Sequence, residues 1–104
     1  MSSKLIRRIR GRRPDDAYPP PPPEGATHVL AYVWHPDGDF SRWELQALSD
    51  YQQHFLSPDA PWFDGPIDLN EAALSWAAET TLGRPVTLTS FPTCPGDNYY
   101  VSPR

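Results

Sequence analysis

The stretch that decides the fold is residues 27–44, THVLAYVWHPDGDFSRWE. Its first eight residues, 27–34, are rich in β-branched and aromatic side chains and are apolar at both alternating sets of positions, which is typical of a buried strand. The two faces of this strand carry Val29, Ala31 and Val33 on one side and His28, Leu30, Tyr32 and Trp34 on the other. The sequence Pro36-Asp37-Gly38 then predicts a turn.

The residues after this turn fit two different elements. Ser41 and Glu44 have the spacing of a helix-capping box. Beyond this box, apolar residues recur at helical spacing: Trp43, Ala47, Leu48, Tyr51 and Phe55. We therefore predict a helix over residues 42–56, and a hairpin strand over residues 40–45 is the competing interpretation.

The second half of the chain alternates turn signals with periodic segments. Residues 57–67, SPDAPWFDGPI, contain three prolines and a glycine and predict a loop. A second helix is predicted to begin at Asp68 and to end at Gly83. Alternation predicts a strand over residues 86–91, and a proline-rich loop leads to a short strand over residues 99–101.

The order β-α-α-β-β predicts an α+β fold. We expect a small two-layer domain in which a three-stranded sheet carries two helices on one face, preceded by a flexible basic arm and a polyproline linker. The aromatic content, with four tryptophans, supplies a core without a metal or disulfide. The single cysteine, Cys94, excludes an internal disulfide.

The chain divides into three parts by composition: residues 1–13, a basic arm; residues 14–25, a proline-rich linker; and residues 26–104, the acidic α+β domain. The arm contains six basic residues and no acid: Lys4, Arg7, Arg8, Arg10, Arg12 and Arg13. The rest of the chain has thirteen acids against three arginines, so the net charges are +6 and −10. The run Pro19–Pro23 predicts a polyproline II rod about 15 Å long.

This charge asymmetry predicts an anionic partner for the arm, through those six basic residues. Nucleic acid ranks first, with strongly salt-dependent binding that is neutral to base sequence. An anionic membrane surface ranks below it, because three aliphatic residues in the arm supply little insertion energy. The alternatives are a solvated tail and an arm that folds back onto the acidic domain.

Exposed aromatic residues predict a second contact, through Trp62, Phe63, Tyr32 and Trp34. Two of them stand in a proline-punctuated loop, and loops carry binding residues. Tyr32 and Trp34 would lie on the sheet face that a two-layer fold leaves uncovered. The acidic domain disfavours nucleic acid there, so we expect a protein partner or a second copy of this chain. The alternative is that Trp62 and Phe63 close one end of the core.

Catalytic, metal and cofactor motifs are not found in the sequence. The four residues His28, His35, His54 and Cys94 have no spacing that resembles a zinc-ligand pair. Cys94 is a nucleophile only if a histidine lies beside it in the fold. We therefore expect no enzyme, no metal and no cofactor. The basic start lacks the apolar run of a signal peptide, and no segment is long enough to span a membrane, which favours a cytoplasmic location.

These observations predict a small non-enzymatic protein-binding, adaptor or modulator protein. Eight arginines against one lysine are typical of a GC-rich genome, such as that of an actinobacterium or its phage. In this interpretation the acidic domain docks a protein through aromatic residues, and the basic arm contacts an anionic surface. The alternatives are an RNA- or DNA-binding protein that depends mainly on the arm, and an acidic nucleic-acid mimic that inhibits a nucleic-acid-handling protein.

Overall fold

The structure, a computed structural model, describes residues 20–93 and 96–104. Within these residues five strands form one antiparallel sheet in the order β4-β3-β2-β6-β5. The strands are β2 (His28–His35), β3 (Phe40–Ala47), β4 (Trp62–Phe63), β5 (Val86–Pro92) and β6 (Asp97–Pro103). The helices are α1 (Leu48–Gln52) and α2 (Glu71–Leu82).

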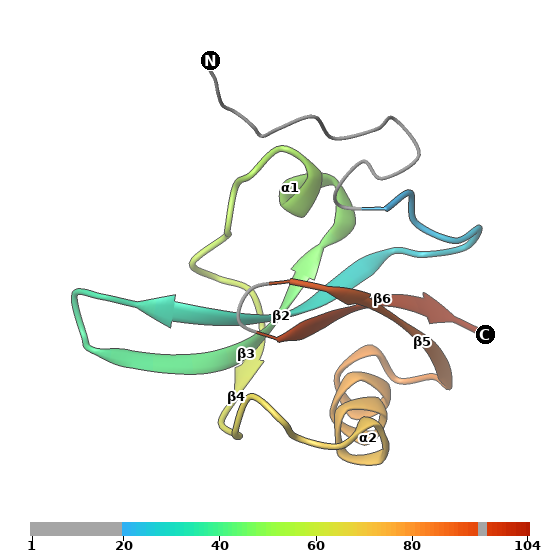
Figure 1. Cartoon of the computed structure of the whole chain (residues 1–104). Helices are drawn as coiled ribbons and strands as arrows, with labels where there is room; N and C mark the ends of the chain where they lie inside the picture. The colour runs from blue at the N-terminus through green and yellow to red at the C-terminus, as the bar shows by residue number, and fades with distance from the viewer. Residues whose placement is uncertain (1–19, 94–95) are drawn as a thin grey trace.

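The predicted three-stranded sheet with two helices on one face is therefore wrong. The helices lie on opposite sides of the five-stranded sheet (Figure 1). Helix α2 packs on one side through Leu74 and Ala78, and α1 packs on the other side through Leu48 and Tyr51. We call these the α2 side and the α1 side. Because each helix covers one side, the expectation of an uncovered sheet face is also wrong.

The predicted helix over residues 42–56 is wrong, and the competing strand interpretation is confirmed. Strand β3 pairs with β2 along all eight positions, from His28 opposite Ala47 to His35 opposite Phe40. The register places Trp43 and Leu45 on the α2 side, and the alternate residues Arg42, Glu44 and Gln46 on the α1 side. Burial on both sides favours the strand, because a strand presents alternate side chains to both layers. Only the five residues of α1 remain helical.

Strand β2 and helix α2 agree with the prediction, apart from the residue that caps α2. The cap is Asn70 rather than Asp68, and its side-chain oxygen accepts a hydrogen bond from the Ala73 amide at 2.9 Å. Gly83 ends α2 in a left-handed conformation with φ of 75°, which glycine adopts without a steric cost. The last two strands are longer than predicted, because β5 and β6 pair over seven positions.

Two apolar clusters form the core, one on each side of the sheet. On the α2 side the buried residues are Leu30, Trp43, Leu45, Leu74, Ala78, Val86, Tyr99 and Val101. On the α1 side they are Val29, Ala31, Phe91 and Tyr100. The segment before β2 is tied to the α1 side, where the Tyr100 hydroxyl donates a hydrogen bond to the Pro20 carbonyl oxygen.

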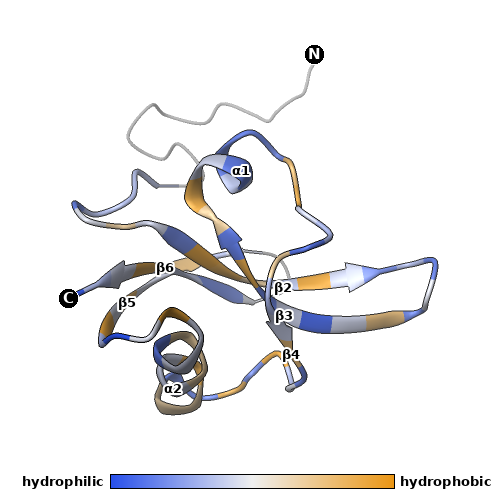
Figure 2. Cartoon of the chain, turned by 180° about the vertical axis from the view of Figure 1, so that it is seen from behind, coloured by the Kyte–Doolittle hydropathy of each residue, from blue (hydrophilic) through white to orange (hydrophobic). Residues whose placement is uncertain are grey.

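The β2–β3 hairpin extends beyond the rest of the sheet (Figure 1). Strand β6 pairs with β2 only over residues 28–30. Beyond Leu30, toward the tip of the hairpin, a side chain takes the place of a backbone partner. The Asn98 Oδ1 atom accepts a hydrogen bond from the Tyr32 amide at 3.2 Å. The projecting hairpin, residues 33–42, is therefore a two-stranded ribbon, and hydrophobic residues still occur along it (Figure 2).

Candidate functional site

The four aromatic residues predicted to bind a partner do not form one patch. Trp34 is 62% exposed on the α2 side, and Trp62 is 51% exposed on the α1 side, next to Glu44 in the β3–β4 register. Tyr32 and Phe63 are half-buried and pack against the α2-side core. The structure thus places two of the four residues at the surface, on opposite sides of the sheet.

Trp62 belongs to a group that the sequence reasoning missed, which we call the stacked patch: His35, Phe40, Arg42 and Trp62. The Arg42 guanidinium carbon lies 4.5 Å from the centre of the Trp62 indole and 5.3 Å from the centre of the Phe40 ring. The His35 ring stacks on Phe40, with 4.8 Å between their centres and 17° between their planes. The patch therefore alternates aromatic rings with a cation, an arrangement that both dispersion and cation–π attraction stabilise.

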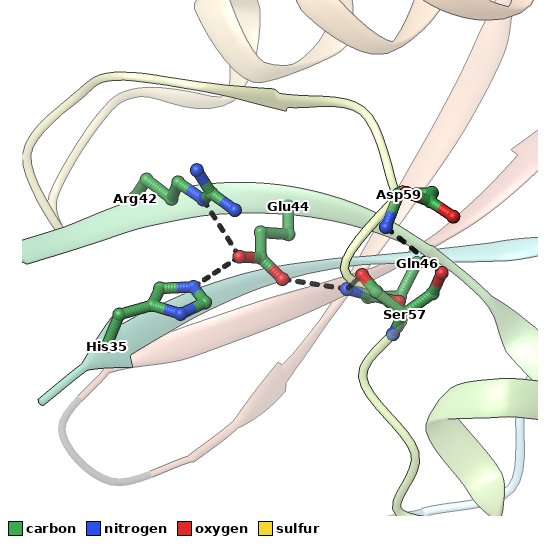
Figure 3. Close-up of polar contacts among 6 residues, drawn as sticks. All are labelled: His35, Arg42, Glu44, Gln46, Ser57 and Asp59. Carbon is green, nitrogen blue, oxygen red and sulfur yellow. Dashed lines mark hydrogen bonds and ion pairs between the residues drawn. The ribbon is translucent and has the colours of Figure 1, made fainter. Parts of the chain in front are cut away.

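The stacked patch rests on a buried carboxylate, Glu44, which is 2% exposed (Figure 3). Its Oε2 accepts a hydrogen bond from Arg42 Nε at 2.9 Å and lies 2.5 Å from His35 Nε2. Its Oε1 accepts from Gln46 Nε2 at 2.7 Å. These contacts orient two side chains of the patch, Arg42 and His35, because both bind the same carboxylate oxygen.

The network also fastens the loop that follows α1. The Ser57 amide donates to Gln46 Oε1 at 3.0 Å, and Gln46 Nε2 donates to the Ser57 carbonyl oxygen at 3.3 Å. The Ser57 hydroxyl accepts from the Asp59 amide at 3.3 Å, and Leu45 donates its amide to the Pro61 carbonyl oxygen at 2.8 Å. This chain of contacts leads directly into β4, so it helps to position Trp62.

The pKa of Glu44 is lower than that of an ordinary glutamate. Burial raises it, but the hydrogen bonds from Arg42, His35 and Gln46 and the charge of His35 outweigh that effect. The ionised form is thus the one that the folded protein favours. The predicted capping box is wrong for this reason, since Glu44 is a buried acceptor in a strand rather than a helix cap.

Glu44 should contribute a pH dependence to stability. Its pKa is lower in the folded state than the ordinary value of 4.5, so the unfolded state binds more protons between those two values. The stabilisation is fully present above pH 4.5 and is lost as the pH falls through the folded-state pKa. We expect the difference in free energy of unfolding between the wild type and Glu44→Gln to shrink on acidification. Urea titrations at a series of pH values from 7 downwards measure this, and a constant difference would contradict it.

The remaining residues named from the sequence are the possible metal ligands, the basic residues of the arm and Cys94. In residues 20–93 and 96–104 no three histidine, cysteine or acidic side chains are placed to hold a metal ion. The six basic residues of the arm and Cys94 lie outside that range. No helix in the same part of the chain is both long and apolar enough to cross a membrane.

The surface around the projecting hairpin is aromatic within an acidic domain. Phe40 is 42% exposed on the α1 side, where Trp62 is also exposed, whereas Trp34 is exposed on the α2 side. Residues 20–104 contain eleven acids and three arginines, and Arg42 is the basic residue that the hairpin contributes. The tryptophans in the sequence indicated this aromatic surface only in part, because the strand register had to show which side chains share a side. Comparisons with protein-family models, with curated proteins and with solved structures found no match for this chain.

Proposed function

We propose that this chain is a small non-enzymatic protein-binding or adaptor protein that docks its partner through the projecting hairpin and β4. The observation that carries the proposal is the exposure of Trp34, Phe40 and Trp62 around one projecting ribbon. Large aromatic side chains are enriched among the residues that dominate binding energy at protein interfaces. A ribbon with such residues on both sides fits a cleft in a partner better than it fits a flat surface.

The hairpin is held in shape before any partner binds. A two-stranded ribbon by itself is marginally stable in water. Here Glu44 fixes Arg42 and His35 from the α1 side, and Asn98 holds the backbone of Tyr32 at the base. Asn98 is itself held, because its Nδ2 donates to the Tyr51 hydroxyl at 3.1 Å. Ordering the anchors in advance lowers the entropy lost on association.

The charge of the domain indicates the kind of partner. With a net charge of −8, residues 20–104 repel polyanions and attract a basic protein surface. Contact of the aromatic residues with a protein is therefore favoured over stacking on nucleic-acid bases. The basic arm would bind an anionic surface independently, and nucleic-acid binding through residues 4–13 remains the second candidate because of the +6 charge of residues 1–13.

The test compares exposed tryptophans in different places. The full-length chain captures its partner from lysate of the source organism with and without nuclease treatment, and the affinity of the purified partner is then measured for each variant. We expect Trp34→Ala combined with Trp62→Ala to weaken binding by about 30-fold or more, the effect of removing interface hot spots. Trp76→Ala is the control, because Trp76 is 69% exposed on α2, and we expect it to leave the affinity unchanged within about twofold.

Three results would overturn the proposal. Equal loss of affinity in the double variant and in Trp76→Ala would show that the hairpin has no special role. Retention that disappears on nuclease treatment would favour the nucleic-acid interpretation, in which the affinity falls steeply with salt concentration. Self-association of the pure chain that Trp62→Ala abolishes, with no other partner retained, would make the hairpin a contact between two copies.

A further inference from the structure

A pocket lies on the α2 side, where the start of α2 approaches the end of the β5–β6 hairpin. This pocket has a volume of about 430 Å³ and includes Ile67, Asp68, Leu69, Asn70, Asp97 and Tyr99 in its lining. None of these residues belongs to the projecting hairpin or to the stacked patch. The pocket is therefore separate from both of these surfaces.

Tyr99 provides a polar group in the wall of this pocket. The residue is only 9% exposed, and its ring packs against Trp43 with 6.2 Å between the centres. Among the described residues no partner forms a hydrogen bond with the Tyr99 hydroxyl, whereas the neighbouring Tyr100 hydroxyl bonds to Pro20. The hydroxyl oxygen is not fully enclosed by protein, so it is open to a ligand in the pocket.

Carboxylates contribute to this pocket. Asp68 and Asp97 belong to its lining, and Glu71 lies close by in the first turn of α2. Burial raises the pKa of Tyr99, and the negative charges of Glu71 and Asp97 raise it further. In the described part of the chain none of these three acids forms an ion pair with a basic side chain. The partial positive charge at the start of α2, about half a unit, is smaller than the charge of the three carboxylates.

The lining of the pocket also has an apolar part. Ile67 and Leu69 line the pocket beside Tyr99. Gly96 approaches Ile67 so closely that a Cβ added at Gly96 would lie 3.1 Å from the Ile67 Cδ1 atom. A ligand that fits these surroundings has an apolar stem and a cationic end that donates several hydrogen bonds.

We propose that this pocket binds an arginine side chain of a partner polypeptide. The alkyl stem would pack against Ile67 and Leu69, and the guanidinium would donate to the carboxylates and to the Tyr99 oxygen. A guanidinium carries five donors in a plane, which suits several acceptors arranged around one cavity. The site is distinct from the projecting hairpin, so the inference does not depend on the proposed docking there.

The test uses acetyl-Gly-Arg-Gly-amide as the probe and the full-length chain labelled with ¹⁵N. We expect the amide signals of Gly96 and Asp97 to shift on titration at low salt, with a dissociation constant in the millimolar range, as for one anchored side chain. The peptide with citrulline in place of arginine has the same shape without the charge, and we expect it to cause no saturable shift. A parallel titration uses a chain whose six arm cations are glutamines, because the arm would otherwise compete as a tethered ligand.

The variants separate the roles of the acceptors. Asp68→Asn combined with Asp97→Asn should weaken binding about tenfold or more, and Tyr99→Phe should weaken it about fivefold while the chain stays folded. Asp59→Asn is the control, because Asp59 lies outside this pocket, and it should leave the affinity within twofold. Equal binding of the citrulline peptide, equal binding of a lysine peptide, or no shift in either form of the chain would overturn the inference. Hairpin variants that lose the protein partner but keep the probe would separate the two sites.

Discussion

Trp43→Ala is expected to lower the free energy of unfolding by about 4 kcal/mol. Trp43 is fully buried at the centre of the α2-side core, and its ring meets Tyr32 edge-on with 5.3 Å between the centres. Its indole N–H donates to the Pro66 carbonyl oxygen at 2.9 Å, which ties the loop before α2 to the sheet. The substitution therefore opens a cavity and also leaves a carbonyl group without its partner.

Two further variants show which part of Trp43 matters. Trp43→Phe keeps a ring in the core but removes the N–H donor, and we expect a loss of about 2 kcal/mol. Trp76→Ala removes an exposed indole from α2 and should change the free energy of unfolding by less than about 0.5 kcal/mol. Urea denaturation followed by far-ultraviolet circular dichroism measures the free energy of unfolding of all three variants. Equal effects of Trp43→Ala and Trp76→Ala would contradict the placement of Trp43 in the core.

Glu44→Gln is expected to lower the free energy of unfolding by about 3 kcal/mol at pH 7. The carboxylate is buried and accepts hydrogen bonds from Arg42 and Gln46. Loss of its charge leaves the mostly buried Arg42 guanidinium without a counter-charge, which costs more than a surface ion pair contributes. The neutral amide also places an NH₂ donor where His35, Arg42 and Gln46 already present hydrogen-bond donors, so these groups lose an acceptor.

The matched control for this variant is Glu24→Gln, which neutralises an exposed carboxylate before β2 and should change stability by less than about 0.5 kcal/mol. Arg42→Gln with Glu44 retained should also be strongly destabilising, because it leaves the buried carboxylate without its cation. Additive effects of the two single variants in the double variant would show that the residues do not interact. A coupling energy of at least about 1 kcal/mol is the expected result.

The two stability variants also bear on partner binding. The Glu44 network holds Arg42 and His35 within the stacked patch, so Glu44→Gln should weaken partner binding even where the chain is fully folded. Trp43→Ala acts on the core instead, and its effect on binding should follow the fraction of chain that is folded. Affinity measured at low temperature, where both variants are folded, distinguishes the two cases.

Parts of the fold followed from local sequence. The β-branched and aromatic residues of β2 predict a buried strand. Helix α2 combines apolar periodicity with a terminal glycine, and both were sufficient to predict it, although the start was displaced by the strong cap at Asn70. The prediction that failed was the helix over residues 42–56, because Trp43, Ala47, Leu48 and Tyr51 satisfy helical spacing by coincidence. Residues 40–47 form a strand because they pair with β2, and short-range sequence patterns carry no information on such pairing.

The candidate sites were predictable only as types of residue. An excess of tryptophan in a small acidic chain indicated an aromatic contact, and Trp34 and Trp62 are indeed exposed. The sides on which they lie depend on the register of β2, β3 and β4, which no motif in the sequence reveals. The sequence pattern predicts Arg42 and Glu44 at a helix start, so it does not indicate the stacked patch. The pocket at Tyr99 joins residues about 30 positions apart, and its acids are not neighbours in the sequence.

The sequence by itself determined the separation of a basic, proline-rich start from an acidic domain, the buried strand β2, and helix α2 with its glycine end. Charge, composition and local backbone preference are sufficient for these features, because each depends on residues within a few positions of one another. Only the tertiary structure decided that residues 40–47 form a strand, that the helices lie on opposite sides, and that Glu44 is buried beneath Arg42 and His35. These features depend on contacts between distant segments, where burial on both sides of a sheet outweighs the weak local preference for a helix.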